Sequence, residues 1–105
     1  MKHSGDDNLE ELYELMRIAL AITKRGYIED DYTKTIYLYI GEGTLSYDPY
    51  YNQLSYDDEE IEISQATFFI KEIKKRLAQV EAKITKSVVE AAFSKPLKIK
   101  LGDLK

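Results

Sequence analysis

The stretch TKTIYLYIGEGTLSYDPYYNQLSYDD, residues 33–58, decides the fold, because apolar and polar side chains alternate along it in short runs. Ile36 and Leu38 point to one side of a strand, while the residues between and around them point to the other. Segments 41–42 and 49–52 interrupt the alternation with the glycine, proline and asparagine that turns favour. The stretch therefore predicts an antiparallel meander.

The register of this meander follows from the side on which each residue lies. Residues directly opposite each other in neighbouring strands share a face of the sheet, so apolar residues should meet apolar residues. A tight turn with glycine first at 41–42 and a longer loop at 49–52 satisfy this condition. The predicted pairs are Leu38 with Leu45, Ile36 with Tyr47, Tyr47 with Leu54, and Leu45 with Tyr56.

Apolar residues at helical spacing on both sides of the meander predict two helices. Asn8, with Glu11 three positions later, has the spacing of a capping box, and Ser64 can cap a second, long helix. Pro96 bars continuation of that helix. The predicted elements are a helix from Asn8 to about residue 25, strands over Tyr32–Ile40, 45–48 and 54–57, a short fourth strand around Ile61 and Ile63, a helix from Ser64 to about Phe93, and a closing strand over 97–101. This order predicts an α+β fold with a mostly antiparallel sheet of three to four strands and both helices on one sheet face.

Length and composition fit one globular domain. The chain has 105 residues, of which 44% are hydrophobic and 32% charged, values far from those of disordered chains. Residues 1–7 are expected to be a disordered tail or a vector remnant, and residues 8–105 the domain. The absence of cysteine excludes disulfides and thiolate metal sites and favours a cytoplasmic location. Arg17 interrupts the apolar run 15–22, which is far short of the roughly 20 residues that cross a bilayer, so no membrane association is expected.

Charge is distributed unevenly along the chain. The net charge is −4, but residues 1–34 carry −3, residues 35–70 carry −7 with no basic side chain, and residues 71–105 carry +6. The folded protein should therefore have an acidic and a basic region, each able to attract an oppositely charged partner.

The polar face of the meander is the first candidate for a binding surface. Tyrosine offers a large amphipathic contact area with few rotatable bonds, and carboxylates among the rings attract a basic partner. The predicted protein-binding residues are Tyr37, Tyr39, Asp48, Tyr50, Tyr51 and Asp57. Two alternatives remain open: tyrosine and threonine suit any solvated strand face, or a second subunit or the first helix covers this face.

The long helix has two further interpretations. Its apolar stripe exceeds what a small sheet can cover, which predicts a homodimer through the stripe, unless the helix bends near Ser87 and folds back onto the same core. The residues of this dimer interface would be Ile73, Leu77, Val80, Ile84 and Val88. Its lysines give the alternative function, a nucleic-acid contact through Lys74, Lys75 and Lys83.

The sequence gives little basis for catalysis. The single histidine, His3, lies in the predicted tail, and no cysteine nucleophile, phosphate loop or metal-ligand spacing occurs. Asp48 and Asp57 could approach across the hairpin, but in open water their pKa values are hard to tune. We therefore expect no cofactor and a non-catalytic module that binds another protein with a basic surface, as inhibitors, immunity proteins and adaptors do; the alternative is a homodimer that binds nucleic acid.

Overall fold

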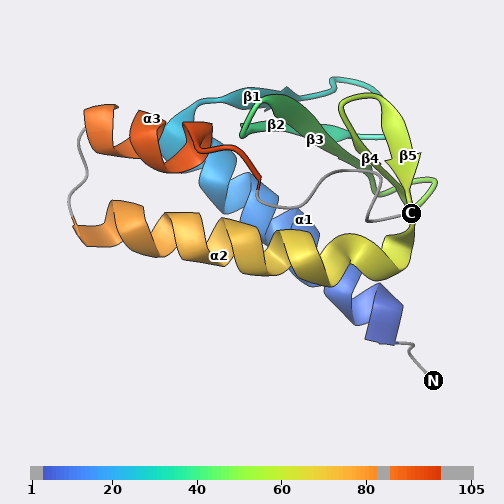
Figure 1. Cartoon of the computed structure of the whole chain (residues 1–105). Coiled ribbons are helices and arrows are strands. Elements are labelled where there is room, and N and C mark those ends of the chain that lie inside the picture. The colour runs from blue at the N-terminus through green and yellow to red at the C-terminus, as the bar shows by residue number, and fades with distance from the viewer. Residues whose placement is uncertain (1–3, 83–85, 98–105) are drawn as a thin grey trace.

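The computed structural model describes residues 4–82 and 86–97. The elements are α1 (Ser4–Thr23), β1 (Gly26–Ile28), β2 (Ile36–Ile40), β3 (Gly43–Asp48), β4 (Gln53–Tyr56), β5 (Glu59–Ile61), the short 3-10 helix η1 (Ile63–Gln65), α2 (Ala66–Ala82) and α3 (Lys86–Ser94). The five strands form one antiparallel sheet in chain order. α1 and α2 lie on one side of this sheet (Figure 1), and α3 lies at its end, where the Gly41 N–H donates to the Phe93 carbonyl at 2.9 Å. This combination of helices and an antiparallel sheet confirms the α+β class.

The register of the central strands is the predicted one. Leu38 lies opposite Leu45, and Tyr47 lies between Ile36 on one side and Leu54 on the other. Successive side chains of a strand point to opposite faces of the sheet, so every second residue points toward the helices. These residues and the apolar residues of the helices form one core. Its largest fully buried members are Leu12, Met16, Ile36, Leu38, Ile40, Leu45, Leu54, Phe69, Ile73, Val80 and Phe93.

The turns of the meander use the backbone conformations that their residues tolerate. Gly41 has φ +66°, as the first central position of a type II′ turn requires. Asp57 and Asp58 both adopt left-handed conformations, with φ of +53° and +69°, the pattern of a type I′ turn between β4 and β5. Aspartate is among the few residues other than glycine that visit this region readily.

The sheet has a strand that the sequence did not indicate. β1 pairs with β2 so that Tyr27 lies opposite Tyr37. Gly26 has φ +144°, and a Cβ at this position would collide with the Tyr37 carbonyl group, so only glycine lets the chain enter the sheet here. The predicted strand over Tyr32–Ile40 was wrong in its first part, because residues 29–35 form the loop that connects β1 to β2.

Both predicted helix caps were wrong. α1 begins at Ser4, before Asn8, and the Asn8 amide donates a hydrogen bond to the Thr67 hydroxyl of α2 at 3.1 Å. Ser64 lies within η1, and Glu62, which precedes η1, makes no side-chain cap. The short fourth strand ends at Ile61 rather than Ile63. The predicted closing strand over 97–101 falls outside the described residues except for Leu97.

The long helix is not continuous, and the alternative in which it folds back is confirmed. α3 lies beside α2 and runs back along it (Figure 1), with Val89, Ala92 and Phe93 buried in the same core. Arg76 of α2, only 4% exposed, holds the end of α3: its Nη1 donates to the carbonyl oxygens of Ala92 at 3.1 Å and Lys95 at 2.7 Å. The carbonyl groups at a helix C-terminus carry partial negative charge and lack partners within the helix, so a buried guanidinium suits them.

This packing removes the basis for the homodimer. Ile73 and Val80 are buried within the chain, Leu77 packs partly buried against the core, and Val88 is half-buried. Ile84 lies outside the described residues. The homodimer stays a prediction that no contact of the described chain supports. No described helix combines the length and the apolar character needed to cross a membrane.

Candidate protein-binding surface

The face of the sheet that points away from the helices carries a row of side chains across all the strands. Register places Tyr27, Tyr37, Ser46, Ser55 and Glu60 side by side in this row. The two rings at its start are stacked, with centroids 4.5 Å apart and an interplanar angle of 17°. The row therefore passes from paired rings through small hydroxyl groups to a carboxylate.

No described helix covers this outer face, because α1 and α2 lie on the other side of the sheet and α3 lies at its end (Figure 1). The alternative in which the first helix covers the tyrosines is thus wrong for α1. The centre of the outer face is a shallow hollow of about 200 Å³, and Tyr37, Ser46, Asp48 and Ser55 contribute to its lining. Small side chains in the middle of the row make this hollow, with larger polar groups around it.

The tip of the β3–β4 hairpin presents two tyrosines to solvent. Tyr50 and Tyr51 are each 60% exposed. The Asp48 carboxylate holds the turn by accepting hydrogen bonds through Oδ1 from the backbone N–H groups of Tyr50 at 2.8 Å and Tyr51 at 3.0 Å. Such a bond from an aspartate to the backbone two residues on is a common way to fix a loop. The Asp48 carboxylate therefore restrains the backbone of the turn that carries both rings.

A third exposed ring completes what we call the tip cluster: Tyr32, Tyr50 and Tyr51. Tyr32, in the β1–β2 loop, is 67% exposed. Its ring packs edge-on against Tyr50 with centroids 4.9 Å apart, and its hydroxyl lies 3.1 Å from that of Tyr51. Tyr50 and Tyr51 also meet edge-on, at 4.8 Å. Three rings from two loops thus support one another while most of their area stays open to solvent.

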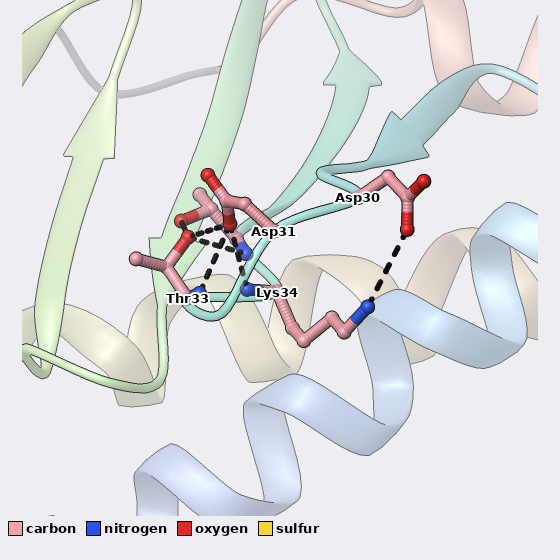
Figure 2. A network of polar contacts seen from close by, with 5 residues as sticks. Asp30, Asp31, Thr33 and Lys34 are labelled. Carbon is pink, nitrogen blue, oxygen red and sulfur yellow. Dashed lines mark hydrogen bonds and ion pairs between the residues drawn. The ribbon is translucent and has the colours of Figure 1, made fainter.

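The β1–β2 loop is fixed by an aspartate in the same way as the hairpin tip. Asp31 Oδ1 accepts hydrogen bonds from the Thr33 hydroxyl at 2.6 Å, the Thr33 N–H at 2.9 Å and the Lys34 N–H at 3.3 Å. Figure 2 shows this network, with the Lys34 side chain extended toward Asp30 and away from Asp31; its Nζ lies 3.6 Å from Asp30 Oδ1. Lys34, the basic residue of this loop, therefore pairs with Asp30 and not with Asp31.

The acid and hydroxyl groups around the cluster shift one another's pKa. The hydrogen bond from the Thr33 hydroxyl lowers the pKa of Asp31, so this group is ionised at neutral pH. The hydrogen bond with Tyr51 raises the pKa of Tyr32, and the charges of Asp31 and Asp48 act in the same direction. Burial, followed by a hydrogen bond with Glu29, raises the pKa of Tyr37 to about 12. The raised pKa values keep the hydroxyl groups of Tyr32 and Tyr37 neutral beside these carboxylates.

The structure divides the predicted binding residues between two ends of the sheet. Asp48, Tyr50 and Tyr51 lie at the hairpin tip, and Tyr37 lies close by, since it lines the same hollow as Asp48. The other two, Tyr39 and Asp57, lie at the opposite end, near the β2–β3 turn. Tyr39 pairs with Thr44, and the backbone N–H of Asp57 donates to the Thr44 carbonyl at 2.8 Å.

The predicted approach of Asp48 and Asp57 across the hairpin is wrong. Asp48 pairs with Gln53, and Asp57 follows four residues later, roughly 13 Å along an extended strand. The two carboxylates therefore do not form the pair that acid–base chemistry would use. Within residues 4–82 and 86–97, no group of three or more acidic or histidine side chains is arranged to hold a metal ion.

Sequence reasoning missed Tyr27 and Tyr32. Tyr27 was overlooked because β1 has only three residues, too few to show an alternating pattern. Tyr32 was assigned to the strand that follows it. The segment Asp31-Tyr32-Thr33 did contain a usable signal, because aspartate two residues before threonine commonly forms a side-chain turn.

The lysines of the alternative nucleic-acid surface are not all available. Lys74 Nζ lies 2.7 Å from Glu11 Oε2 of α1, so its charge is partly compensated. Lys75 is exposed, and Lys83 lies outside the described residues. Phosphate binding depends on clustered, uncompensated cations, and the described part of α2 offers few of them.

Comparison with known proteins gives no further guidance, since no family model, no curated protein and no solved structure matches this chain. The functional argument therefore rests on the surface itself.

Proposed function

We propose that this chain is a non-catalytic module that binds another protein through the hairpin tip and the adjoining outer face of the sheet. The partner presents a basic surface. The observation that carries the proposal is the tip cluster: three tyrosines, each at least 60% exposed, held together by ring contacts and a hydroxyl pair. Large exposed rings gathered at one place are typical of binding hot spots.

The arrangement of these rings favours tight contact at low entropic cost. A tyrosine side chain has few rotatable bonds to immobilise, and here Tyr32 and Tyr51 already restrain each other through their hydroxyl groups. The aspartates that fix the two loops reduce the backbone freedom that binding would otherwise remove. A partner thus meets a surface that is largely in its bound arrangement.

The charge around the cluster favours a basic partner. Asp31 and Asp48 lie beside the cluster, and each accepts hydrogen bonds from backbone N–H groups through Oδ1. Residues 35–70 contain no lysine or arginine, so the outer face keeps its negative field. Complementary charge raises association rates and disfavours acidic competitors.

A binding role without catalysis agrees with the residues present. The chain has one histidine and no cysteine, and the carboxylates of the surface do not form a close pair. A chain without cysteine requires no oxidising compartment, so the proposal places the module in the cytoplasm.

The proposal is tested by binding assays with a double variant, Tyr50→Ala with Tyr51→Ala. Partners captured from an extract by the wild-type protein are purified, and their affinities for wild type and variant are measured by calorimetry. We expect at least a tenfold loss of affinity, because hot-spot rings cost about 2 kcal/mol or more each. The melting temperature should stay nearly unchanged, since both rings are exposed.

The matched control truncates two exposed apolar side chains elsewhere, Ile18→Ala with Ile22→Ala, which are 47% and 41% exposed on α1. This control should keep wild-type affinity. Equal affinity of the tyrosine variant and wild type for every captured partner would show that the tip is not a binding site. Binding that does not weaken as salt is raised would contradict the basic character of the partner.

A further inference from the structure

A cleft of about 540 Å³ lies between α1 and the hairpin tip, on the helix side of the tip rather than on the outer face. Glu10, Tyr13 and Glu14 of α1 form one wall, and Tyr47, Pro49 and Asn52 of the hairpin contribute to the other. The volume is within the range of about 300 to 1,000 Å³ that is usual for sites of small ligands. The binding surface described above makes no use of this cleft.

The aromatic part of the cleft is held in place by contacts within the chain. Tyr13 and Tyr47 meet edge-on, with centroids 6.1 Å apart and an interplanar angle of 67°. The Tyr47 ring is buried, and its hydroxyl donates a hydrogen bond to Asn52 Oδ1 at 2.9 Å. This bond ties the end of the hairpin loop to the wall, so the cleft does not depend on a loose side chain. The faces of such rings attract cations.

The charged part of the cleft is negative. Glu10 and Glu14 are four residues apart on α1, a spacing that places both carboxylates on one face of a helix. Both side chains are exposed, and none of the residues that line the cleft is basic. Carboxylates beside an aromatic wall select a cationic group over a neutral or anionic one.

The chain itself shows this selectivity at the rim of the cleft. The Arg17 guanidinium carbon lies 5.9 Å from the centre of the Tyr13 ring. Its Nη1 lies 3.2 Å from Glu14 Oε1, and the two side chains are 55% and 64% exposed. Ring and carboxylate thus already hold one guanidinium. An exposed pair of this kind is weak and can be replaced by an incoming cation.

We propose that this cleft binds an arginine side chain of the partner protein. The inference rests on the proposed function, because Pro49 and Asn52 of the cleft flank Tyr50 and Tyr51 of the tip cluster in the same hairpin loop, so that one partner contacts both. It adds the chemical identity of the group that enters the cleft: a planar guanidinium that stacks on Tyr13 and pairs with Glu14.

The test uses a small probe, so it does not require the partner. Nα-acetyl-arginine methylamide is titrated into isotopically labelled protein and the backbone amide signals are followed by NMR. Nα-acetyl-citrulline methylamide, nearly identical in shape but uncharged, is the control. We expect saturable shifts at Tyr13, Glu14 and Asn52 with the arginine probe and none with the citrulline probe.

Variants sharpen the test. Glu14→Gln should weaken binding of the arginine probe by about 1.4- to 5-fold, whereas the control Glu42→Gln, which removes the same charge from an exposed position outside the cleft, should not. Arg17→Ala removes the internal competitor and should tighten binding by about 1.4- to 5-fold. Thermal melting of each variant confirms that the fold is kept.

Absence of saturable shifts, or equal shifts with the citrulline probe, would overturn the inference. Shifts confined to the tip cluster would also overturn it, while leaving the tip as a binding surface. Conversely, arginine binding in the cleft together with an unaltered affinity of the Tyr50→Ala, Tyr51→Ala variant for partners would support the cleft and contradict the proposed function.

Discussion

The contact between Arg76 and the end of α3 gives the sharpest prediction about stability. Arg76→Met removes the guanidinium but keeps an unbranched apolar side chain in its place. The two hydrogen bonds to the end of α3 are lost, from Nη1 to the carbonyl oxygens of Ala92 at 3.1 Å and Lys95 at 2.7 Å, together with the pair that Nη2 makes with Glu72 at 3.3 Å. Bonds with a charged partner contribute about 1.5 to 3 kcal/mol each, so the two bonds to α3 together contribute at most about 3 to 6 kcal/mol.

Two effects reduce this figure. Burial of a guanidinium has a desolvation cost, which the substitution removes, and among the described residues the Arg76 Nε finds no hydrogen-bond acceptor to offset that cost. Methionine also fills the space of the aliphatic stem well. We therefore expect a loss of about 2 to 4 kcal/mol in the free energy of unfolding. This is a large share of the roughly 5 to 15 kcal/mol that stabilises a typical domain.

The assay is urea denaturation followed by far-UV circular dichroism, since the chain contains no tryptophan. Hydrogen exchange locates the effect: amides of α3 should exchange faster in Arg76→Met, while those of β2 and β3 lose protection only with global unfolding. Glu72→Gln is the control. Glu72 pairs with Arg76 Nη2 at 3.3 Å with 18% of its side chain exposed. Glutamine keeps an oxygen that can accept the same hydrogen bond, so this substitution should destabilise the protein less than Arg76→Met. If the free energy of unfolding of Arg76→Met lies within about 0.5 kcal/mol of the wild-type value, apolar contacts alone hold α3. The hydrogen bonds from Arg76 are then not the reason that the helix folds back.

Two further predictions concern the sheet face and the lysines. The pKa of Tyr37 is raised from 10.0 to about 12, so above pH 10 the unfolded state releases this proton first and the folded state loses stability as pH rises toward 12. Denaturation measured at several pH values should therefore show that Tyr37→Phe loses less stability than wild type over this interval. An identical decline in the two proteins would show that the Tyr37 hydroxyl titrates normally. Since Lys74 is paired with Glu11, labelled DNA and RNA duplexes should show no saturable change in fluorescence anisotropy when the protein is added at about 50 mM salt. If the duplexes do bind, and the double variant Lys74→Gln, Lys75→Gln abolishes this binding, the result would favour the nucleic-acid alternative.

Much of the sheet could be predicted because its determinants are local. Period-two alternation places Ile36 and Leu38 on one face, and a glycine in the turn at 41–42 sets their partners. The same reasoning correctly separated the buried Tyr47 from the outward Tyr37. For the binding surface, the sequence pattern indicated the tip residues Tyr50 and Tyr51 but not Tyr32, whose ring joins them from the β1–β2 loop.

The remaining features depend on contacts between distant parts of the chain. The apolar spacing runs from Ile70 through Ala91 without a clear stop, so periodicity alone cannot show that α2 ends at Ala82 and that a second helix turns back. Arg76 contributes to that choice, because its side chain donates to carbonyl groups 16 and 19 residues further along.

The sequence by itself therefore determined the α+β class, the register of the central strands and the side to which Tyr37, Tyr39, Tyr47 and Tyr56 point, because alternation and turn chemistry act between residues close in the chain. Only the tertiary structure decided that β1 joins the sheet, that α3 folds back, and that Tyr32 meets Tyr50 and Tyr51. Each of these depends on the free energy of a contact between segments brought together by folding, and such a contact leaves no periodic trace in either segment.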